Sequence, residues 1–109
     1  MSNSDLHYLE LLEVGRLIQS RELSSVEVTK AQLARIDKID GALKSYVRTM
    51  ADSALAEAAR ADAEIAKGEL RGPLQGVPVG VKDLCWTQGV PTAAGMTLEP
   101  ENVKVGDGL

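Results

Sequence analysis

The fold is decided by residues 76–84, which read Gly-Val-Pro-Val-Gly-Val-Lys-Asp-Leu. Three valines in this stretch alternate with Pro78, Gly80 and Lys82, and a period of two is the pattern of a β-strand. Alternation places the valines on one face of the strand and the other three residues on the opposite face. The small neighbours on that second face leave room for the lysine stem. The pattern therefore predicts a short buried strand that ends in a lysine.

The strand-end position of Lys82 leaves two interpretations open. In the first, Lys82 is a solvated or ion-paired structural charge, and the periodicity alone favours this one. In the second, its amine points into a pocket. Because burying an unpaired ammonium is costly, such a lysine tends to lose its proton and to act as a base.

Upstream of this strand the sequence predicts three helices. They cover residues 5–19, 25–37 and 50–67. Ser4 is the expected N-cap of the first helix, and Ser24 with Glu27 has the form of a capping box at the start of the second. Gly41 and Gly68 are the expected stops of the second and third helices. The third helix is rich in alanine, so we expect it to cover a neighbour closely rather than to form a core alone.

The fold class that follows is α/β, as an α+β fragment. Helices, and a short extended stretch expected at residues 43–47, lead into one clear strand, and one strand does not close a sheet. The composition agrees, because 44% of the residues are apolar but only 3% are aromatic, which suits aliphatic helices packed on a sheet. We expect the start of a larger α/β or α+β domain.

Charge and composition exclude several function classes. The net charge of −4 with no basic run argues against nucleic acids and anionic membranes as partners. One cysteine and one histidine exclude an intramolecular disulfide and make a protein-only zinc site improbable. The sequence shows no signal peptide and no transmembrane segment, so we expect a cytoplasmic protein.

The lysine motif has a family resemblance. Residues 76–84, followed by Thr-Gln-Gly-Val-Pro-Thr-Ala-Ala-Gly at 87–95, closely resemble the N-terminal part of amidase signature enzymes. The upstream layout of a Leu-rich helix, a Ser-Ser-Val-Glu helix start and an Ala-rich helix is similar too. The resemblance implies that residues 1–97 are the N-terminal part of an amidase domain whose mixed sheet begins with the predicted strand. It stops at residues 98–109, which we interpret as a divergent tail.

The resemblance also implies an activity. Amidase signature enzymes hydrolyse carboxamide C–N bonds with a Ser–cis-Ser–Lys triad, in which the lysine acts as general base through a bridging serine. Residue by residue, only Lys82 falls on a catalytic position. Backbone N–H groups of downstream loops would hold the oxyanion. The implied partner is a small-molecule amide substrate, and no cofactor is implied; the oligomeric state stays open.

The two serines of that triad have no counterpart among the 109 residues. In the family they belong to a Gly/Ser-rich segment downstream of the lysine motif, whereas Ser24 and Ser25 belong to a helix cap and Ser45 and Ser53 stand apart. Premature termination, a frameshift, alternative splicing or deliberate shortening would each give such a chain. Two alternatives therefore remain beside an amidase. One is the glutaminase-type subunit of a tRNA-dependent amidotransferase, and the other is a non-catalytic truncated product.

Four further residues receive structural interpretations. Cys85, beside the lysine, is expected to be an inert, semi-buried thiol, since no histidine or cation partner is indicated for a thiolate. Asp83 is expected to satisfy local backbone N–H groups and so to help aim Lys82. Trp86 is expected to pack over the strand, and His7 to be an ordinary surface residue. Residues 89–96 lack the helix that a phosphate-binding loop requires and are expected to form a loop after the strand.

Overall fold

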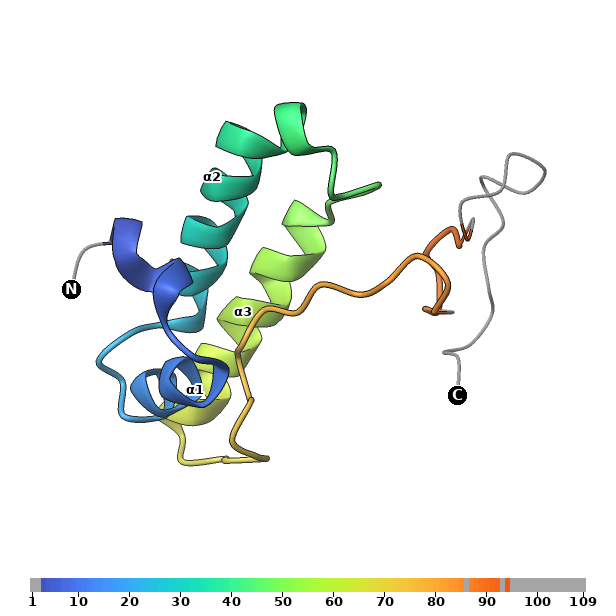
Figure 1. Ribbon diagram of the computed structural model, residues 1–109. Coiled ribbons are helices and arrows are strands. Elements are labelled where there is room, and N and C mark those ends of the chain that lie inside the picture. The colour runs from blue at the N-terminus through green and yellow to red at the C-terminus, as the bar shows by residue number, and fades with distance from the viewer. Residues whose placement is uncertain (1–2, 86, 93, 95–109) are drawn as a thin grey trace. The chain divides into compact units, whose positions relative to one another are not determined.

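The computed structural model describes residues 3–85, 87–92 and 94 (Figure 1). The chain divides into two units, residues 1–78 and residues 79–109. The first unit holds the helices, and the second holds Lys82 and the loop after it. The predicted boundary at residue 97 and the tail at 98–109 lie outside the described residues and stay predictions.

The first unit begins with two short helices in place of the single helix predicted over residues 5–19. A 3₁₀ helix, η1, covers Asn3–Tyr8, and α1 covers Leu11–Gln19. Glu10 has an extended backbone, with φ −72° and ψ 153°, and it is the N-cap of α1. Ser4 therefore lies within η1 and does not cap a long helix. The break lets apolar residues of both short helices face the same core.

The second helix, α2, covers Ser25–Leu43 and begins as predicted. Ser24 Oγ accepts the amide of Glu27 at 3.0 Å, and the Glu27 carboxylate accepts the amide of Ser24 at 3.0 Å. The predicted stop was wrong, because α2 continues through Gly41. It ends where Lys44 takes the left-handed conformation, with φ 53°.

The predicted extended stretch at residues 43–47 was also wrong. Leu43 is the last residue of α2, and the chain then folds over the end of the helix. Asp40 Oδ1 accepts the amides of Ser45 at 2.7 Å and Tyr46 at 3.3 Å. This side chain satisfies backbone donors after the helix, which leaves them unavailable for pairing with a strand.

The third helix, α3, covers Ala51–Ala66, close to the predicted range. Its last turn is followed by Gly68, whose φ of +80° is the left-handed conformation that closes helices. The prediction that Gly68 ends this helix is therefore confirmed.

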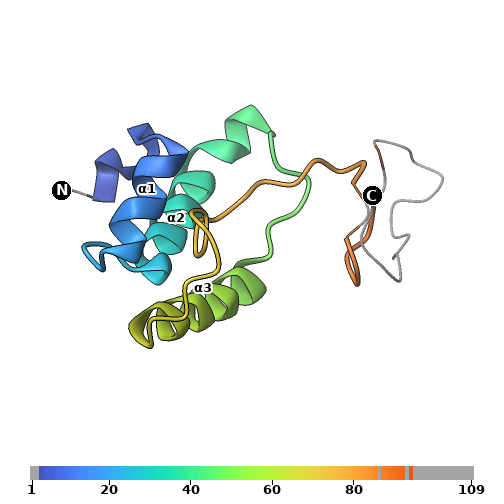
Figure 2. The ribbon, with the colours of Figure 1, turned by 90° about the horizontal axis from the view of Figure 1, so that it is seen from below.

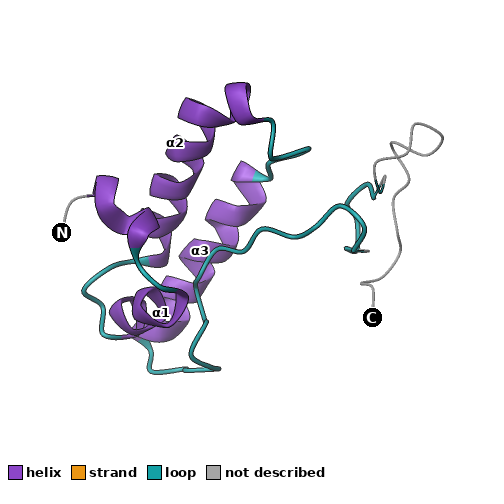
Figure 3. Ribbon diagram, viewed as in Figure 1, coloured by secondary structure: helices purple, strands orange, loops and turns teal. Residues whose placement is uncertain are grey.

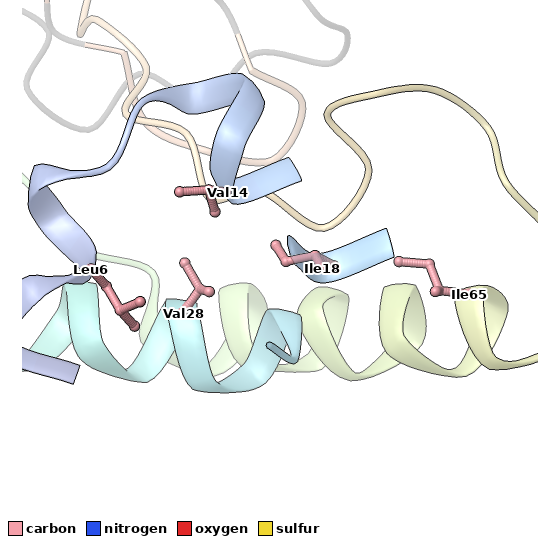
Figure 4. Close-up of a cluster of buried hydrophobic side chains, with 5 residues drawn as sticks. All are labelled: Leu6, Val14, Ile18, Val28 and Ile65. Atoms are coloured by element: carbon pink, nitrogen blue, oxygen red, sulfur yellow. The ribbon is translucent and has the colours of Figure 1, made fainter. Parts of the chain in front are cut away.

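The helices pack around one small core. Helix α2 lies alongside α3 and against η1, and the two views agree on this arrangement (Figures 1 and 2). Figure 4 shows apolar side chains from all four helices converging. They are Leu6 of η1, Val14 and Ile18 of α1, Val28 of α2 and Ile65 of α3. On α3, Ala58 and Ala61 are buried, so small side chains let this helix lie close to its neighbour, as expected.

The strand predicted over residues 77–81 is absent from the described part of the chain, where Figure 3 shows only helices and loops. Val77 is half-buried against the helical core, but Val79 and Val81 are 74% and 61% exposed. A strand needs the N–H and C=O groups of a neighbour, and no described segment supplies them. The helical part of the predicted architecture therefore stands, and the sheet has no counterpart in the described residues.

Candidate functional site

Lys82 lies in a turn and not at the end of a strand. The amide of Cys85 donates to the Lys82 carbonyl oxygen at 2.9 Å, so the chain turns directly after the lysine. The side chain of Lys82 is exposed, and so is that of Leu84. The buried amine that the catalytic interpretation needs is thus not formed by the described residues alone.

The loop after the lysine motif returns to it. The amide of Val90 donates to the Thr87 carbonyl oxygen at 3.1 Å, and Gly89 has a φ of +76° that permits the turn. The amide of Ala94 then donates to the carbonyl oxygen of Asp83 at 3.0 Å. This bond places the end of the loop beside the residue that follows Lys82. The loop expected over residues 89–96 is therefore present in its described part.

The structure changes the interpretation of the neighbouring residues. Cys85 is exposed, so the expectation of a semi-buried thiol was wrong. Asp83 is half-buried and serves the local backbone through its carbonyl oxygen, while the role of its carboxylate stays a prediction. Trp86 lies outside the described residues.

His7 is not the ordinary surface residue that the sequence predicted. It is half-buried near the end of η1, with its ring 4.0 Å from the ring of Tyr8. Its Nε2 atom is buried and has no hydrogen-bond partner among the residues that the structure describes. The sequence analysis did not predict the burial of His7, which comes from its place directly after the core residue Leu6.

The four serines considered as possible nucleophiles lie at or near the ends of helices. Ser24 caps α2, and Ser25 is 1% exposed in its first turn. Ser45 follows α2 and Ser53 lies in the first turn of α3. These four serines belong to the first unit, whereas the predicted site residue, Lys82, belongs to the second.

A hollow of about 300 Å³ in the first unit lies at the start of α2. Three acidic side chains line it: Glu27 and Asp62 accept backbone amides at that end of the helix, and Glu22 accepts the hydroxyl of Ser20. Among the described residues there is no cluster of three or more His, Cys, Asp or Glu side chains that could hold a metal. No described helix has the length and apolar character needed to cross a membrane.

Sequence comparison now places these features in a family. The profile of the amidase family matches residues 27–109, which include the lysine turn and the returning loop. The chain belongs to the amidase family. The resemblance seen in the lysine motif is therefore confirmed.

Relatives of this amidase-family chain are several times longer. A Mycobacterium tuberculosis (strain ATCC 25618 / H37Rv) protein, provisionally named amidase AmiD, is 56% identical over 90 residues, which are 83% of this chain and 19% of the relative. A glutamyl-tRNA(Gln) amidotransferase subunit of Methylococcus capsulatus is 47% identical over 90 residues, which are 83% of this chain and 18% of that relative. The chain thus spans about a fifth of the length of these relatives.

A solved structure shares the fold. It was reported for a vestigial protein complex that reveals the evolutionary origins of an s-triazine catabolic enzyme. The superposition has a TM-score of 0.80 at 33% identity, and it covers 91% of this chain and 22% of the other. The fold described above is therefore also present in a part of that longer solved chain.

Proposed function

We propose that this chain supplies the general-base lysine of an amidase-type hydrolase that cleaves the C–N bond of small carboxamides. The observation that carries the proposal is the lysine motif at residues 76–84, which lies within the part matched by the amidase family. The loop that returns to Asp83 supports it, because a reacting lysine needs fixed surroundings.

The chemistry follows the triad of the family. The neutral amine of Lys82 would accept a proton from a bridging serine, which in turn takes the proton of a nucleophilic serine as that oxygen attacks the amide carbonyl carbon. The C–N bond then breaks, the proton passes to the leaving amine, and an acyl ester of the serine remains. Water attacks the ester by the same route, which releases the carboxylic acid and restores the serine.

Both serines would come from the part of the amidase domain that these 109 residues do not include. The exposure of Val79 and Val81 supports this, because apolar surface of this kind is what a further layer of a domain covers. We propose that residues 77–81 form their strand against that layer. Covering Lys82 would also remove it from water, which favours the neutral amine that a base requires.

A second candidate is a glutaminase-type subunit of a tRNA-dependent amidotransferase, which shares the motif. The identity of 47% to such a subunit supports it, and the higher identity of 56% to the mycobacterial protein supports simple amide hydrolysis. A cytoplasmic location stays a prediction from the sequence for either candidate.

The test of this function joins the chain to the remaining domain of the mycobacterial relative and assays carboxamide hydrolysis. We expect Lys82→Ala to lower kcat by about 10²- to 10⁴-fold, the usual contribution of a general base. Lys30→Ala, which changes an exposed lysine of α2, is the matched control and should keep full activity. Full activity of the Lys82→Ala variant would exclude the proposed role of the lysine.

The chain alone gives a second outcome to measure. Because it has no counterpart of either serine, the purified 109-residue chain should hydrolyse no simple amide. Reproducible hydrolysis by the chain alone, abolished by Lys82→Ala, would show that a nucleophile lies within these residues and would overturn the proposed division of the triad.

A further inference from the structure

The segment that leads into the lysine motif, residues 71–77, is held by side chains from all three α-helices. We call it the clamped segment. It lies within the first unit, and it contains no helix or strand of its own. Loops are normally more mobile than helices and strands, so the many hydrogen bonds that hold this one are unusual.

Gln75 holds the clamped segment from within. Its side chain is buried, with 8% of the residue exposed, and both of its polar atoms are bonded. Oε1 accepts the amide of Arg71 at 2.8 Å, while Nε2 donates to Glu64 Oε2 of α3 at 3.0 Å and to the Glu69 carbonyl oxygen at 3.1 Å. Glu64 also pairs with the Arg71 guanidinium at 2.8 Å. The start of the segment is thereby tied to α3.

Two side chains hold the segment from outside. Gln19, the last residue of α1, donates from Nε2 to the carbonyl oxygen of Gly72. Ser25, in the first turn of α2, donates from Oγ to the carbonyl oxygen of Gly76. Ser25 is 1% exposed and Gly76 is half-buried, so this bond is partly shielded from water, and its loss would leave the carbonyl oxygen of Gly76 without this donor.

Two glycines show how closely the segment approaches the helices. A Cβ atom at Gly15 of α1 would overlap the carbonyl oxygen of Pro73. A Cβ atom at Gly76 would lie 3.1 Å from Ser25 Cβ and 3.3 Å from Ile18 Cγ2, and Gly76 has a φ of +85°. Both the backbone conformation and the space therefore require glycine at position 76.

These contacts lie shortly before Lys82 in the sequence. Lys82 follows the anchored Gly76 by six residues. Proton transfer needs its groups positioned to a fraction of an ångström, and a misplacement of about 1 Å can reduce a rate 10²-fold. An anchor shortly before the base removes freedom that the lysine motif would otherwise have.

We propose that Gln19, Ser25 and Gln75 are positioning residues for Lys82, and that they do so by fixing the segment at residues 71–77 against the three α-helices. The proposal rests on the proposed function for its catalytic consequence. Its structural part concerns the first unit alone and is tested without any activity.

The structural test is residue-resolved hydrogen exchange on the full 109-residue chain. The amides of Gln75 and Val77 donate within the clamped segment, to Gly72 at 3.3 Å and Leu74 at 3.0 Å, and so report its opening. We expect Ser25→Ala to accelerate exchange of these two amides by about tenfold, the effect of one lost hydrogen bond. Amides in the middle of α3 should change less than twofold.

Thr29→Val is the matched control. Thr29 is 3% exposed on α2, one turn after Ser25, so the variant removes a buried hydroxyl of the same helix outside the clamp contacts described above. It should leave unchanged the ratio of the exchange rate of the Val77 amide to the exchange rates of amides in the middle of α3. Gln19→Leu is the second variant, in case Ser25→Ala prevents folding. It should accelerate hydrogen exchange of the Gln75 amide while amides in the middle of α3 change less than twofold.

Two results would overturn the clamp. Equal acceleration at Val77 and in α3 would show that Ser25 supports only overall stability. Unchanged exchange at Gln75 and Val77 in both variants would show that the hydrogen bonds do not hold the segment.

The catalytic consequence is measured in the fused protein used to test the proposed function. A positioning role predicts that Ser25→Ala lowers kcat about tenfold or more while KM stays within twofold, and that Thr29→Val changes neither. If the fused protein hydrolyses amides and Ser25→Ala leaves kcat unchanged, the positioning role is wrong even where exchange confirms the clamp. If the unmodified fused protein is inactive, the proposed function fails, and the exchange data still decide the clamp.

Discussion

At the scale of single residues, Asp62 has a role that its place in the sequence does not show. From α3 it accepts two amides of the first turn of α2, with Oδ1 2.6 Å from the nitrogen of Ser25 and Oδ2 3.1 Å from that of Val26. Ser24 Oγ accepts the amide of Glu27. The first three donors of α2 are thus bonded by side chains, and a carboxylate lies at the positive end of the helix dipole.

We therefore predict that Asp62→Ala lowers the free energy of unfolding by about 1–3 kcal/mol, because two amides lose a charged acceptor. The measurement is a urea titration followed by far-UV circular dichroism. Glu57→Ala is the control on the same helix, where the side chain is exposed, and it should change stability by less than about 0.5 kcal/mol. Equal effects of the two variants would mean that the bonds to α2 contribute no stability.

At the scale of elements, two helical glycines meet opposite surroundings. Gly15 of α1 is buried against Pro73, whereas a Cβ atom added at Gly41 of α2 would meet no other described segment within 4 Å. Alanine favours a helix over glycine at both positions, so the surroundings decide the sign of each substitution.

Gly15→Ala is expected to destabilise the chain by about 1–3 kcal/mol, because the added methyl group displaces the backbone at Pro73. It should also loosen the clamped segment. Gly41→Ala is expected to stabilise α2 by about 0.5–1 kcal/mol. Urea titration of both variants checks this, and a stabilising Gly15→Ala would show that α1 and the segment do not pack as described.

The elements also show how far local sequence predicts structure. The capping box of Ser24 and Glu27 and the stop at Gly68 were predicted because each depends on residues a few positions apart. The break at Glu10 was missed because the apolar pattern runs on across it. The passage of α2 through Gly41 was missed because Asp40 and Lys44 close the helix further on.

At the scale of the whole molecule, the helical unit has a small core and much apolar surface. Leu43, Val47 and Leu70 are 65%, 77% and 57% exposed. Exposed apolar surface of this kind is typical of places where other parts of a protein pack, and this chain covers 19% of its mycobacterial relative.

We predict that the isolated chain gives a helical circular dichroism spectrum with a broad, weakly cooperative thermal transition. A core of this size gives little cooperativity when apolar surface stays in water. Calorimetry beside circular dichroism checks this. A sharp two-state transition, with equal calorimetric and van't Hoff enthalpies, would instead indicate a complete small domain.

The sequence also predicted only part of the candidate site. The lysine motif pointed to the amidase family, and the family match confirms that assignment. The alternation of residue types alone could not establish a strand over residues 77–81 or a buried Lys82 amine. Both features depend on which segments pack against these residues. Gln19 and Ser25 donate to carbonyl oxygens 53 and 51 residues away, and Gln75 donates to Glu64 of α3, 11 residues away, so no short sequence pattern predicts these contacts.

The sequence by itself determined the three α-helical regions, the cap of α2 and the family of the lysine motif. These depend on hydrogen bonds and side-chain patterns that span only a few residues. Only the tertiary structure decided that Asp62 caps α2, that residues 71–77 are held by three helices, and that Lys82 lies exposed in a turn. Each of these results from contacts between distant segments, or from the lack of a partner strand among the described residues, and such contacts leave no local pattern in the sequence.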